Sequence, residues 1–565
     1  MTSKSRKVIL IVLFVLYLPT LGVFHVGAAS ESVSVLTNRY DINRSGANLN
    51  ETILNTSNVN VQQFGKLFTR QVVGDIYAQP LYYPNLTIPG KGTHNVVFVA
   101  TSDNNVYAFD ADDPQQSTAL WQINLGPYVT KNLYKGDIWD GQDGVLSTPV
   151  IDPATQTMYV ISHHPNGNSN AKHVLHALDI TTGAERTALG SPVTIQATVP
   201  SFSCGSVGGV LSFDSNLQLQ RPGLLLLNGV VYAGFGSSGS SGYYHGWLLG
   251  FDAKNIRQQT VRFNASAGKA CRFLSTEAGR TICKTTPDYV SPSAQEGFGA
   301  SFWQSGTGLS SDGTSIFGVT GNGAFSAYEG GTDYGDSVLK LNPKLVVQDY
   351  FTPNTQFCLD KTDYDLGITG ALIIPNTNLV IVSGKDANLY LIDKRNMGKY
   401  DAETHTNPNF QTLPIGQGVP YNTPIFWNSP TGPVLYTWNS EDNAKQWGFA
   451  AFNDGLAKLN PTPLSVSTFH SPGSPGGILA LSANGSTPGT GILWGTQQTD
   501  DTHAGILRAW DATDISKELW DSDMAANGRD KYGKIAKFNQ PTIANGKVYQ
   551  GTFSDTLDVY GLLPS

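Results

Sequence analysis

Residues 96–110 read VVFVATSDNNVYAFD: a strand, a polar turn and a second strand that ends on Asp110. Apolar residues alternate along each half, which is typical of strands with one buried face. Copies of all or part of this unit are 174–179 (VLHALD), 247–252 (WLLGFD), 380–393 (VIVSGKDANLYLID) and 506–511 (ILRAWD), with weaker copies at 337–342 (SVLKLN), 448–453 (GFAAFN) and 547–560 (KVYQGTFSDTLDVY). The chain is therefore predicted to be built from one repeated β-unit.

A further strand, often opened by Pro, precedes each unit. These segments are 77–84 (YAQPLYYP), 146–152 (LSTPVID), 221–228 (RPGLLLLN), 306–311 (GTGLSS), 367–375 (GITGALIIP), 421–427 (YNTPIFW), 475–482 (PGGILALS) and 538–544 (FNQPTIA). They define eight units in the chain. Each unit has about 67 residues, compared with roughly 40–50 in a minimal four-stranded blade, which leaves room for long loops.

Repeated antiparallel sheets have exposed edges unless the array closes into a ring. We therefore predict an all-β fold, a single eight-bladed β-propeller over residues 30–565. The segment 64–74 (FGKLFTRQVVG) has no strand partner upstream, and the last unit ends at Tyr560 without an outer strand. The N-terminal strand is therefore predicted to complete the last blade. The alternative is two separate all-β domains, but no Pro/Ser/Thr-rich linker divides the halves.

The composition indicates a folded chain and argues against one class of binding partner. Charged residues make up 14% of the chain, and the formal net charge is −8. No basic stripe is present, which argues against a nucleic-acid partner. With 40% hydrophobic and 10% aromatic residues, the chain can bury a large core. Its many turn-forming residues, 60 Gly and 30 Pro, favour a β-rich fold over helical bundles.

The N-terminus has the pattern of a secretory signal peptide over residues 1–29. Lys4, Arg6 and Lys7 precede an apolar run from Val8 to Val26, and small residues follow it. Cleavage is expected after Ala28 or Ala29, which predicts a secreted, extracellular protein that is not inserted in a membrane. The alternative is an uncleaved N-terminal helix that anchors the protein, because the apolar run could nearly span a bilayer.

The cysteines predict disulfides if the chain is exported. We expect Cys271–Cys283 to close a short loop and Cys204–Cys358 to join distant segments, although three pairings are possible. No Cys-x-x-Cys-His motif is present, so no attached haem is expected.

Six sequons follow the signal-like segment and are the predicted N-glycosylation sites of an exported chain. They are Asn43, Asn50, Asn55, Asn85, Asn264 and Asn484.

Two stretches, 106–121 (VYAFDADD…ALW) and 507–520 (LRAWDATDISKELW), carry a family resemblance. Each resembles the repeat of the pyrroloquinoline-quinone (PQQ) dehydrogenases, in which a strand ends in Asp and a Trp follows. The chain also resembles secreted quinoprotein-like propellers. The shared elements are 39–52 (RYDINRSGANLNET), 243–253 (YYHGWLLGFDA), 302–308 (FWQSGTG) and 319–323 (VTGNG). The resemblance implies the eight-bladed propeller of the quinoprotein alcohol dehydrogenases.

Three residues match the cofactor site of that family in the right order. Asn322 in TGNG is similar to the family's calcium-binding Asn, and Asp363 to its catalytic Asp. Lys385 is similar to the basic residue beside the quinone. The implied chemistry is coherent, because Ca²⁺ prefers oxygen ligands, an alcohol needs a carboxylate base, and a cation stabilises a reduced quinone. The resemblance thus implies PQQ with calcium, and oxidation of alcohols or sugars.

The sequence also departs from the family. The stretch 236–242 (GSSGSSG) has no carboxylate where the family has its calcium-binding Glu, which leaves Asp363 or Asp365 to replace it. The vicinal disulfide is absent, and Thr362 replaces a Trp. Three functions stay open: a PQQ-dependent dehydrogenase, a catalytically silent propeller that binds a small molecule or glycan at its axial mouth, and an extracellular scaffold.

Two polar clusters outside these motifs have simpler readings. Asp137, Asp140 and Asp143 lie in a Gly-rich loop without EF-hand spacing, so we expect a solvated loop. The pairs 163–164 and 173/176 contain four histidines but lack the spacing of a helical zinc motif. We assign no zinc to them.

Overall fold

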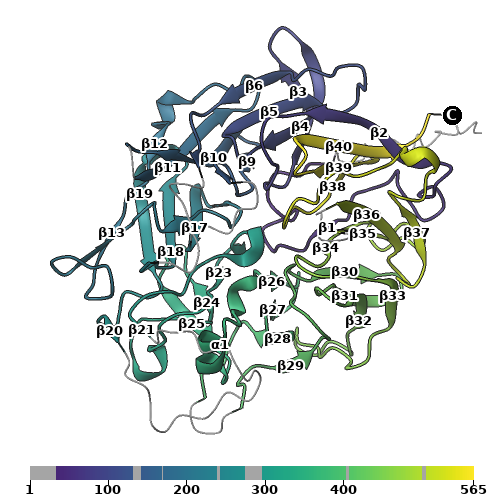
Figure 1. Ribbon diagram of the computed structural model, residues 1–565. Coiled ribbons are helices and arrows are strands. Elements are labelled where there is room, and N and C mark those ends of the chain that lie inside the picture. The colour runs from purple at the N-terminus through teal and green to yellow at the C-terminus, as the bar shows by residue number, and fades with distance from the viewer. Residues whose placement is uncertain are drawn as a thin grey trace, which may run out of the picture. The chain divides into compact units, whose positions relative to one another are not determined.

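The computed structural model describes residues 33–130, 141–167, 170–237, 242–273, 295–401, 406–498 and 504–564. Within the compact unit Val33–Ser565, eight antiparallel sheets of four or more strands are arranged as blades around an axis (Figure 1). The prediction of an all-β, eight-bladed propeller is confirmed. The predicted signal peptide, residues 1–29, lies outside the described residues.

The first four blades follow one another along the chain, and their strands pair antiparallel in sequence order, except that β15 and β16 of blade 3 both pair with β17. Blade 1 contains β3 (Leu81–Ile88), β4 (Gly92–Ala100), β5 (Asn105–Asp110) and β6 (Trp121–Asn124); blade 2 contains β9 (Val150–Asp152), β10 (Thr157–Pro165), β11 (Ala171–Asp179) and β12 (Val193–Thr194); blade 3 contains β15 (Gln218–Leu219), β16 (Leu225–Leu227), β17 (Val230–Ser237), β18 (Trp247–Asp252) and β19 (Asn255–Asn264); blade 4 contains β22 (Ser310–Ser311), β23 (Ile316–Val319), β24 (Val338–Leu341) and β25 (Val347–Phe351).

The other four blades complete the ring. Blade 5 contains β26 (Leu372–Ile373), β27 (Leu379–Ser383), β28 (Asn388–Asp393) and β29 (Gln411–Pro414); blade 6 contains β30 (Ile425–Ser429), β31 (Gly432–Thr437), β32 (Asn443–Gly448) and β33 (Ser465–His470); blade 7 contains β34 (Ile478–Ser482), β35 (Ile492–Gln498), β36 (Gly505–Asp511) and β37 (Glu518–Asp521), joined by β1 (Ala47–Asn48); blade 8 contains β38 (Thr542–Ala544), β39 (Lys547–Gly551), β40 (Thr556–Leu562) and β2 (Phe64–Gln71).

Short elements occupy the connections between and within blades. They are the strand pairs β7 (Val129–Thr130) with β8 (Gln142–Asp143), β13 (Thr198–Pro200) with β14 (Val210–Ser212) and β20 (Arg272–Phe273) with β21 (Gln295–Glu296), the helix α1 (Gln356–Thr362), and the 3-10 turns η1 (Thr187–Leu189), η2 (Gln304–Gly306), η3 (Ala327–Glu329), η4 (Leu366–Ile368) and η5 (Ala526–Gly528).

The predicted repeat units coincide with strands in all blades but one. The third strand of blade 6 is β32, and the segment 448–453 begins only at its last residue, so that prediction is wrong. The buried alternate positions of β32 are Ala444, Gln446 and Gly448. Small or polar residues at buried positions remove the alternation in hydropathy that marks the other third strands.

The Asp that recurs at the end of third strands closes the following turn. In each case its carboxylate accepts a hydrogen bond from the backbone N–H two residues later. The N–H donor and its carboxylate acceptor, in that order, are Asp112 and Asp110, Thr181 and Asp179, Lys254 and Asp252, Arg395 and Asp393, and Thr513 and Asp511. Asp is well suited to this position because its short side chain reaches its own turn. The motif is therefore explained by local structure.

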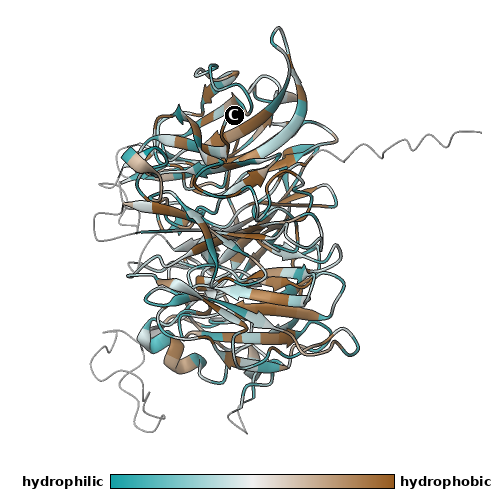
Figure 2. Ribbon diagram, turned by 90° about the vertical axis from the view of Figure 1, so that its right-hand side faces the viewer, coloured by the Kyte–Doolittle hydropathy of each residue, from teal (hydrophilic) through white to brown (hydrophobic). Residues whose placement is uncertain are grey.

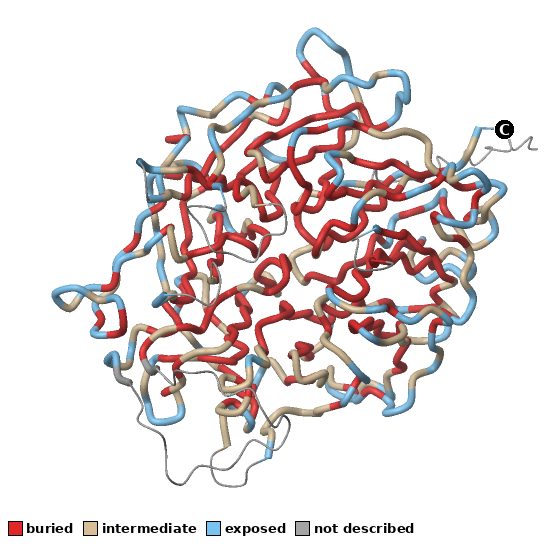
Figure 3. The backbone as a smooth tube through the Cα atoms, in the orientation of Figure 1, coloured by how far each residue is buried: buried red, intermediate tan, exposed pale blue. Residues whose placement is uncertain are grey.

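Apolar side chains gather between neighbouring blades. For example, Phe317 of blade 4 packs in one cluster with Val380 and Tyr390 of blade 5. The strands carry most of the apolar residues, and buried positions fill the inner part of the ring (Figures 2 and 3). Trp427 and Trp494 belong to such clusters and are 0% exposed, so neither offers a ring face to a ligand.

Closure by the N-terminal strand is confirmed. β2 pairs antiparallel with β40, from Phe64 opposite Leu562 to Gln71 opposite Thr556. The Phe64 side chain is fully buried, and its ring centroid lies 5.4 Å from that of Trp494 and 5.0 Å from that of Trp520. The strand therefore joins blade 8 and contacts blade 7 through one aromatic anchor.

We expect Phe64→Ala to lower the free energy of unfolding by about 3–5 kcal/mol, because it leaves a cavity between two Trp rings. The measurement is chemical denaturation followed by tryptophan fluorescence. Phe202→Ala is the matched control, since Phe202 is 77% exposed and its loss leaves no cavity. Equal midpoints for the two variants would contradict the anchoring role of β2.

The segment 35–48, called the central segment below, runs through the centre of the ring (Figure 1). Its backbone carbonyls accept hydrogen bonds from the first strands of blades 2, 4, 5, 6 and 7. The N–H donor of the blade and the carbonyl acceptor of the central segment, in that order, are Ile151 and Leu36, Ser311 and Ile42, Ile373 and Asn43, Phe426 and Ser45, and Leu481 and Gly46. At its end, β1 pairs in parallel with β34. The sequence pattern did not predict this segment, because its partners lie far along the chain.

Two arginines of the central segment donate hydrogen bonds to blades 3, 4 and 6 from within the ring. The Arg44 guanidinium donates to the carbonyls of Leu309 at 2.9 Å and Leu224 at 3.2 Å. The Arg39 guanidinium donates to Pro424 O at 2.8 Å. The other contacts are Val35 with Tyr82 in blade 1 and Tyr40 with Ile543 in blade 8. Every blade is thus bonded to the central segment at its first strand or just before it.

Candidate functional site

The structure brings the three predicted site residues together. Asn322 follows β23, Asp363 ends α1 and Lys385 follows β27. Asn322 Nδ2 donates to Asp363 Oδ1 at 3.1 Å, and Lys385 Nζ donates to the Asp363 carbonyl at 3.0 Å and to its Oδ2 at 3.2 Å. Blades 4 and 5 therefore form one site from residues that lie up to 63 positions apart in the sequence.

Asp365 connects the other members of the site. Its Oδ1 accepts the Asn322 N–H at 2.9 Å, its carbonyl accepts the Lys385 N–H at 3.0 Å, and its Oδ2 lies 2.5 Å from Lys385 Nζ. A Cβ added at Gly321 would lie 2.5 Å from Asp365 Oδ1, so only glycine allows this approach. Asp363 has φ 59° and ψ 38°, a left-handed conformation that Asp tolerates at the end of a helix.

Lys385 carries the positive charge of the site. Burial alone would lower the pKa of Lys385, but the charges of Asp365 and Asp363 outweigh it and raise the pKa. The pKa of Asp363 is also raised, first by burial and then by the charge of Asp365. The Asp363 side chain is 71% exposed and that of Lys385 is 18% exposed. The site is therefore an ion pair that solvent reaches on the Asp363 side.

Sequence reasoning missed two further acids and a tyrosine. Burial raises the pKa of Asp360 to about 6, and the charge of Asp365 adds to the shift. Asp336 is fully buried, and burial followed by the charges of Asp365 and Asp360 raises its pKa well above the usual range. Burial and these same acids raise the pKa of Tyr244. No local pattern separates such residues from those of an ordinary polar loop, so only the fold identifies them.

Solved structures with this architecture are known. The quinohemoprotein alcohol dehydrogenase from Comamonas testosteroni has a TM-score of 0.56 and 13% sequence identity, over 94% of this chain and 80% of that chain. A europium-containing methanol dehydrogenase has a TM-score of 0.55 and 12% identity, over 94% of this chain and 98% of that chain. The chain has the quinoprotein dehydrogenase fold. No family model and no curated protein matches its sequence.

Within this quinoprotein fold, the residues present do not fit a calcium ion with its quinone. Lys385 already bonds to both Asp363 and Asp365. The stretch 236–242 supplies no carboxylate. In the described part of the chain, no three His, Cys, Asp or Glu side chains are arranged to hold a metal ion. The buried Asn322 Oδ1 has no hydrogen-bond partner among the described residues and could act as one ligand atom, but Ca²⁺ needs six to eight oxygens.

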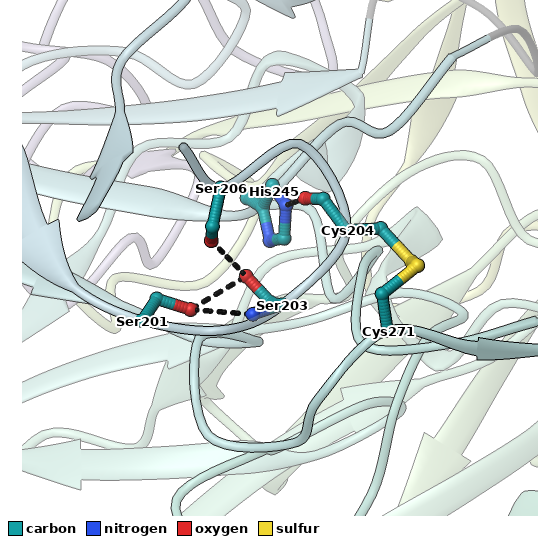
Figure 4. The surroundings of a disulfide bond; sticks show 6 residues. All are labelled: Ser201, Ser203, Cys204, Ser206, His245 and Cys271. Carbon is teal, nitrogen blue, oxygen red and sulfur yellow. Dashed lines mark hydrogen bonds between the residues drawn. A yellow bond between two sulfur atoms is a disulfide. The ribbon is translucent and has the colours of Figure 1, made fainter. Parts of the chain in front are cut away.

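The disulfide differs from both predicted pairs. Cys204 is bonded to Cys271, which contradicts Cys204–Cys358 and Cys271–Cys283 (Figure 4). Loop length along the sequence favoured the short Cys271–Cys283 loop, but the fold places the β13–β14 connection beside residue 271. There the Cys271 N–H donates to the Phe202 carbonyl at 3.1 Å. Cys358 is also disulfide-bonded, and Cys283 lies outside the described residues.

The sequons differ in exposure. Asn50, Asn85 and Asn484 are exposed, and Asn43 and Asn55 are half-buried. An N-linked glycan attaches to the side-chain nitrogen of Asn. That nitrogen is buried in Asn264, whose residue is only 8% exposed, so the prediction of a glycan at Asn264 is corrected. The other five sequons stay predictions.

The other polar clusters lie inside blade 2 and its connection. Asp143 Oδ2 is 2.9 Å from His163 Nδ1 and both side chains are buried, so the expectation of a solvated loop is wrong for Asp143. Asp137 and Asp140 lie outside the described residues. The His163 and His173 rings stack at 3.9 Å, and Ser162 Oγ lies 2.6–2.7 Å from the Nε2 atoms of His164 and His176.

No helix among the described residues is long and apolar enough to span a bilayer. The Cys204–Cys271 disulfide is consistent with an oxidising compartment.

Proposed function

We propose that this protein is an exported propeller that binds a small hydroxylated molecule, a sugar or another polyol, at the Asn322–Asp363–Lys385 site. The observation that carries the proposal is the convergence of these residues from two blades, with the Asp363 carboxylate open to solvent. Ligand sites place a few convergent polar groups on a rigid scaffold.

The charges of the site support this class of ligand. A hydroxyl group both donates and accepts, and here a carboxylate acceptor lies beside the ammonium of Lys385 and the amide of Asn322. An anionic ligand would face the carboxylates of Asp363 and Asp365, whose charge Lys385 only partly offsets. A neutral polyol meets no such repulsion.

Two other functions are the alternatives to this proposal. A PQQ-dependent dehydrogenase of alcohols or sugars would use Asp363 as base, but it needs calcium ligands that the described residues do not assemble. A scaffold would bind partners through its outer faces and would not depend on the site. Export itself is supported by the signal-like N-terminus and by the disulfide.

The test is calorimetry on the full secreted protein with a panel of neutral mono- and disaccharides and polyols, and separately with PQQ with and without Ca²⁺. We expect saturable binding of at least one polyol, weakened about tenfold or more by Asp363→Asn, because a charge-assisted hydrogen bond is lost. The matched control is Asp514→Asn, because the half-buried Asp514 pairs with Lys517 at 3.3 Å between β36 and β37, away from the site.

The other outcomes overturn the proposal in different ways. Calcium-dependent PQQ binding that Asp363→Asn abolishes would establish the dehydrogenase. Polyol binding that is equal in the wild type, Asp363→Asn and Asp514→Asn would place the ligand elsewhere. Absence of any binding would leave the scaffold function.

A further inference from the structure

We infer that the protein has a second ligand site, for a neutral saccharide, on the face of the ring opposite the Asn322–Asp363–Lys385 site. A cavity of about 720 Å³ lies between the central segment and blades 5 and 6. Its walls include the turn 375–377 between β26 and β27, and Asn428 and Pro433 at the turn between β30 and β31.

The two sites lie on opposite faces because successive strands of a blade run antiparallel. Turns from the first to the second strand leave one face, and turns from the second to the third leave the other. Lys385 and Asn322 lie on connections of the second kind, whereas 375–377 is a turn of the first kind. A ligand in this cavity is therefore independent of the proposed function.

The walls of the cavity are held in place by hydrogen bonds. The Phe426 N–H donates to Ser45 O at 3.4 Å and the Ile373 N–H donates to Asn43 O at 3.1 Å, which fixes the central segment against blades 6 and 5. The Asp41 carboxylate accepts the Ser45 N–H at 3.1 Å. A site on such fixed backbone needs little ordering when a ligand binds.

The lining has the chemistry of a saccharide site. Tyr40, Phe426 and Phe452 provide rings on which the CH face of a sugar can pack. Within the described part of the chain, the side-chain amides of Asn376 and Asn428 make no hydrogen bond, so they are available to hydroxyl groups. Among the residues that the structure describes, no Lys, Arg or His lines the cavity, which disfavours an anionic ligand. The volume lies in the range of roughly 300–1,000 Å³ typical of small-molecule sites.

The saccharide has two conceivable sources. One is a free sugar from solution. The other is the chain's own glycan, because the exposed sequon residue Asn50 also lines the cavity. A free sugar and the Asn50-linked glycan would make the same contacts with the aromatic rings of the cavity. The experiment distinguishes these two sources by using protein with and without N-glycans.

The experiment uses the full chain made in the bacterial periplasm, where disulfides form and N-glycans are absent. Saturation-transfer NMR and calorimetry are run with glucose, maltose, N-acetylglucosamine and chitobiose. We expect a component of sugar binding that Phe452→Ala weakens about tenfold or more through lost ring stacking, separate from any component that Asp363→Asn weakens at the other face. Gln259→Ala is the matched control, because Gln259 lines a second cavity of about 720 Å³ that also contains Arg262 and Lys344.

Glycosylated protein forms the second arm. If free sugars do not bind, contacts by NMR between the Asn50-linked glycan and Phe452, lost in Phe452→Ala, would support the site with the chain's own glycan as occupant. The inference is overturned if neither arm shows a sugar at Phe452, or if Phe452→Ala and Gln259→Ala weaken binding equally. Loss of binding in Asp363→Asn alone would assign the sugar to the other face.

Discussion

Arg44→Met is expected to lower the free energy of unfolding by about 3–5 kcal/mol, because it leaves several buried carbonyls without a hydrogen-bond donor. Arg44 is 0% exposed, and its guanidinium also donates to Asn38 O at 2.7 Å and to Thr37 Oγ1 at 2.8 Å. Burial lowers its pKa to about 10, which leaves it charged at neutral pH. Met replaces the aliphatic part of the side chain but not the guanidinium, so the loss combines the missing hydrogen bonds with the space that the guanidinium occupied. Chemical denaturation with two optical probes is the measurement.

The matched control for Arg44→Met is Arg395→Met. Arg395 forms ion pairs with Asp393 at 2.8 Å and Asp454 at 2.6 Å, but its side chain is 42% exposed. Surface ion pairs contribute little, so its denaturation midpoint is expected to stay close to that of the wild type. If the denaturation midpoint of Arg44→Met also stayed close to that of the wild type, the hydrogen bonds of the central segment would not contribute to the stability of the ring.

The blades could be predicted from sequence because their signal is local. Alternating hydropathy and a turn-closing Asp, as in residues 96–110, are properties of about 15 neighbouring residues, and the ring follows from the need to bury sheet edges. The central segment has no such signal. Arg39 and Arg44 bind carbonyls of the blades that lie 180 or more positions away, and a carbonyl has no sequence signature.

The disulfide and the candidate site were also only partly predictable from the sequence, because they depend on contacts between distant residues. Cys204 and Cys271 are 67 residues apart, and they meet because the β13–β14 connection lies beside residue 271, where the Cys271 N–H donates to the Phe202 carbonyl. Sequence separation does not report this proximity. Asn322, Asp363 and Lys385 were found through their resemblance to a family motif, and the structure brings them together. Asp336 and Asp360 lie outside any motif, and their perturbed pKa values arise from burial that only the folded chain creates.

Lys385→Met is expected to destabilise the protein at neutral pH and much less in acid. The substitution leaves Asp363 and Asp365 facing each other without their shared cation. We expect a loss of about 1–3 kcal/mol at pH 7, below the value for a fully buried pair because solvent screens Asp363. The measurement is chemical denaturation at several values between pH 4 and pH 8.5.

The pH dependence follows from the direction of the shifts. The folded-state pKa of Asp363 is already above its unfolded value, and removal of the ammonium raises it further. An acid whose pKa is raised on folding binds its proton more tightly in the folded state, so stability is regained as pH falls through the folded pKa. The deficit of Lys385→Met should therefore shrink toward pH 4. In the wild type the contribution of Lys385 is lost only above pH about 10.4, its unfolded pKa.

Two variants separate charge from shape in this prediction. Lys385→Arg retains a cation and should restore most of the stability at pH 7, although its planar group fits the Asp363–Asp365 pair differently. Lys517→Met removes an exposed Lys, 65% accessible, from its pair with Asp514 and should leave the denaturation midpoint unchanged at every pH. A deficit in Lys385→Met that is independent of pH, or that Lys385→Arg does not relieve, would show that Lys385 acts by packing and that the acids of the site do not need its charge.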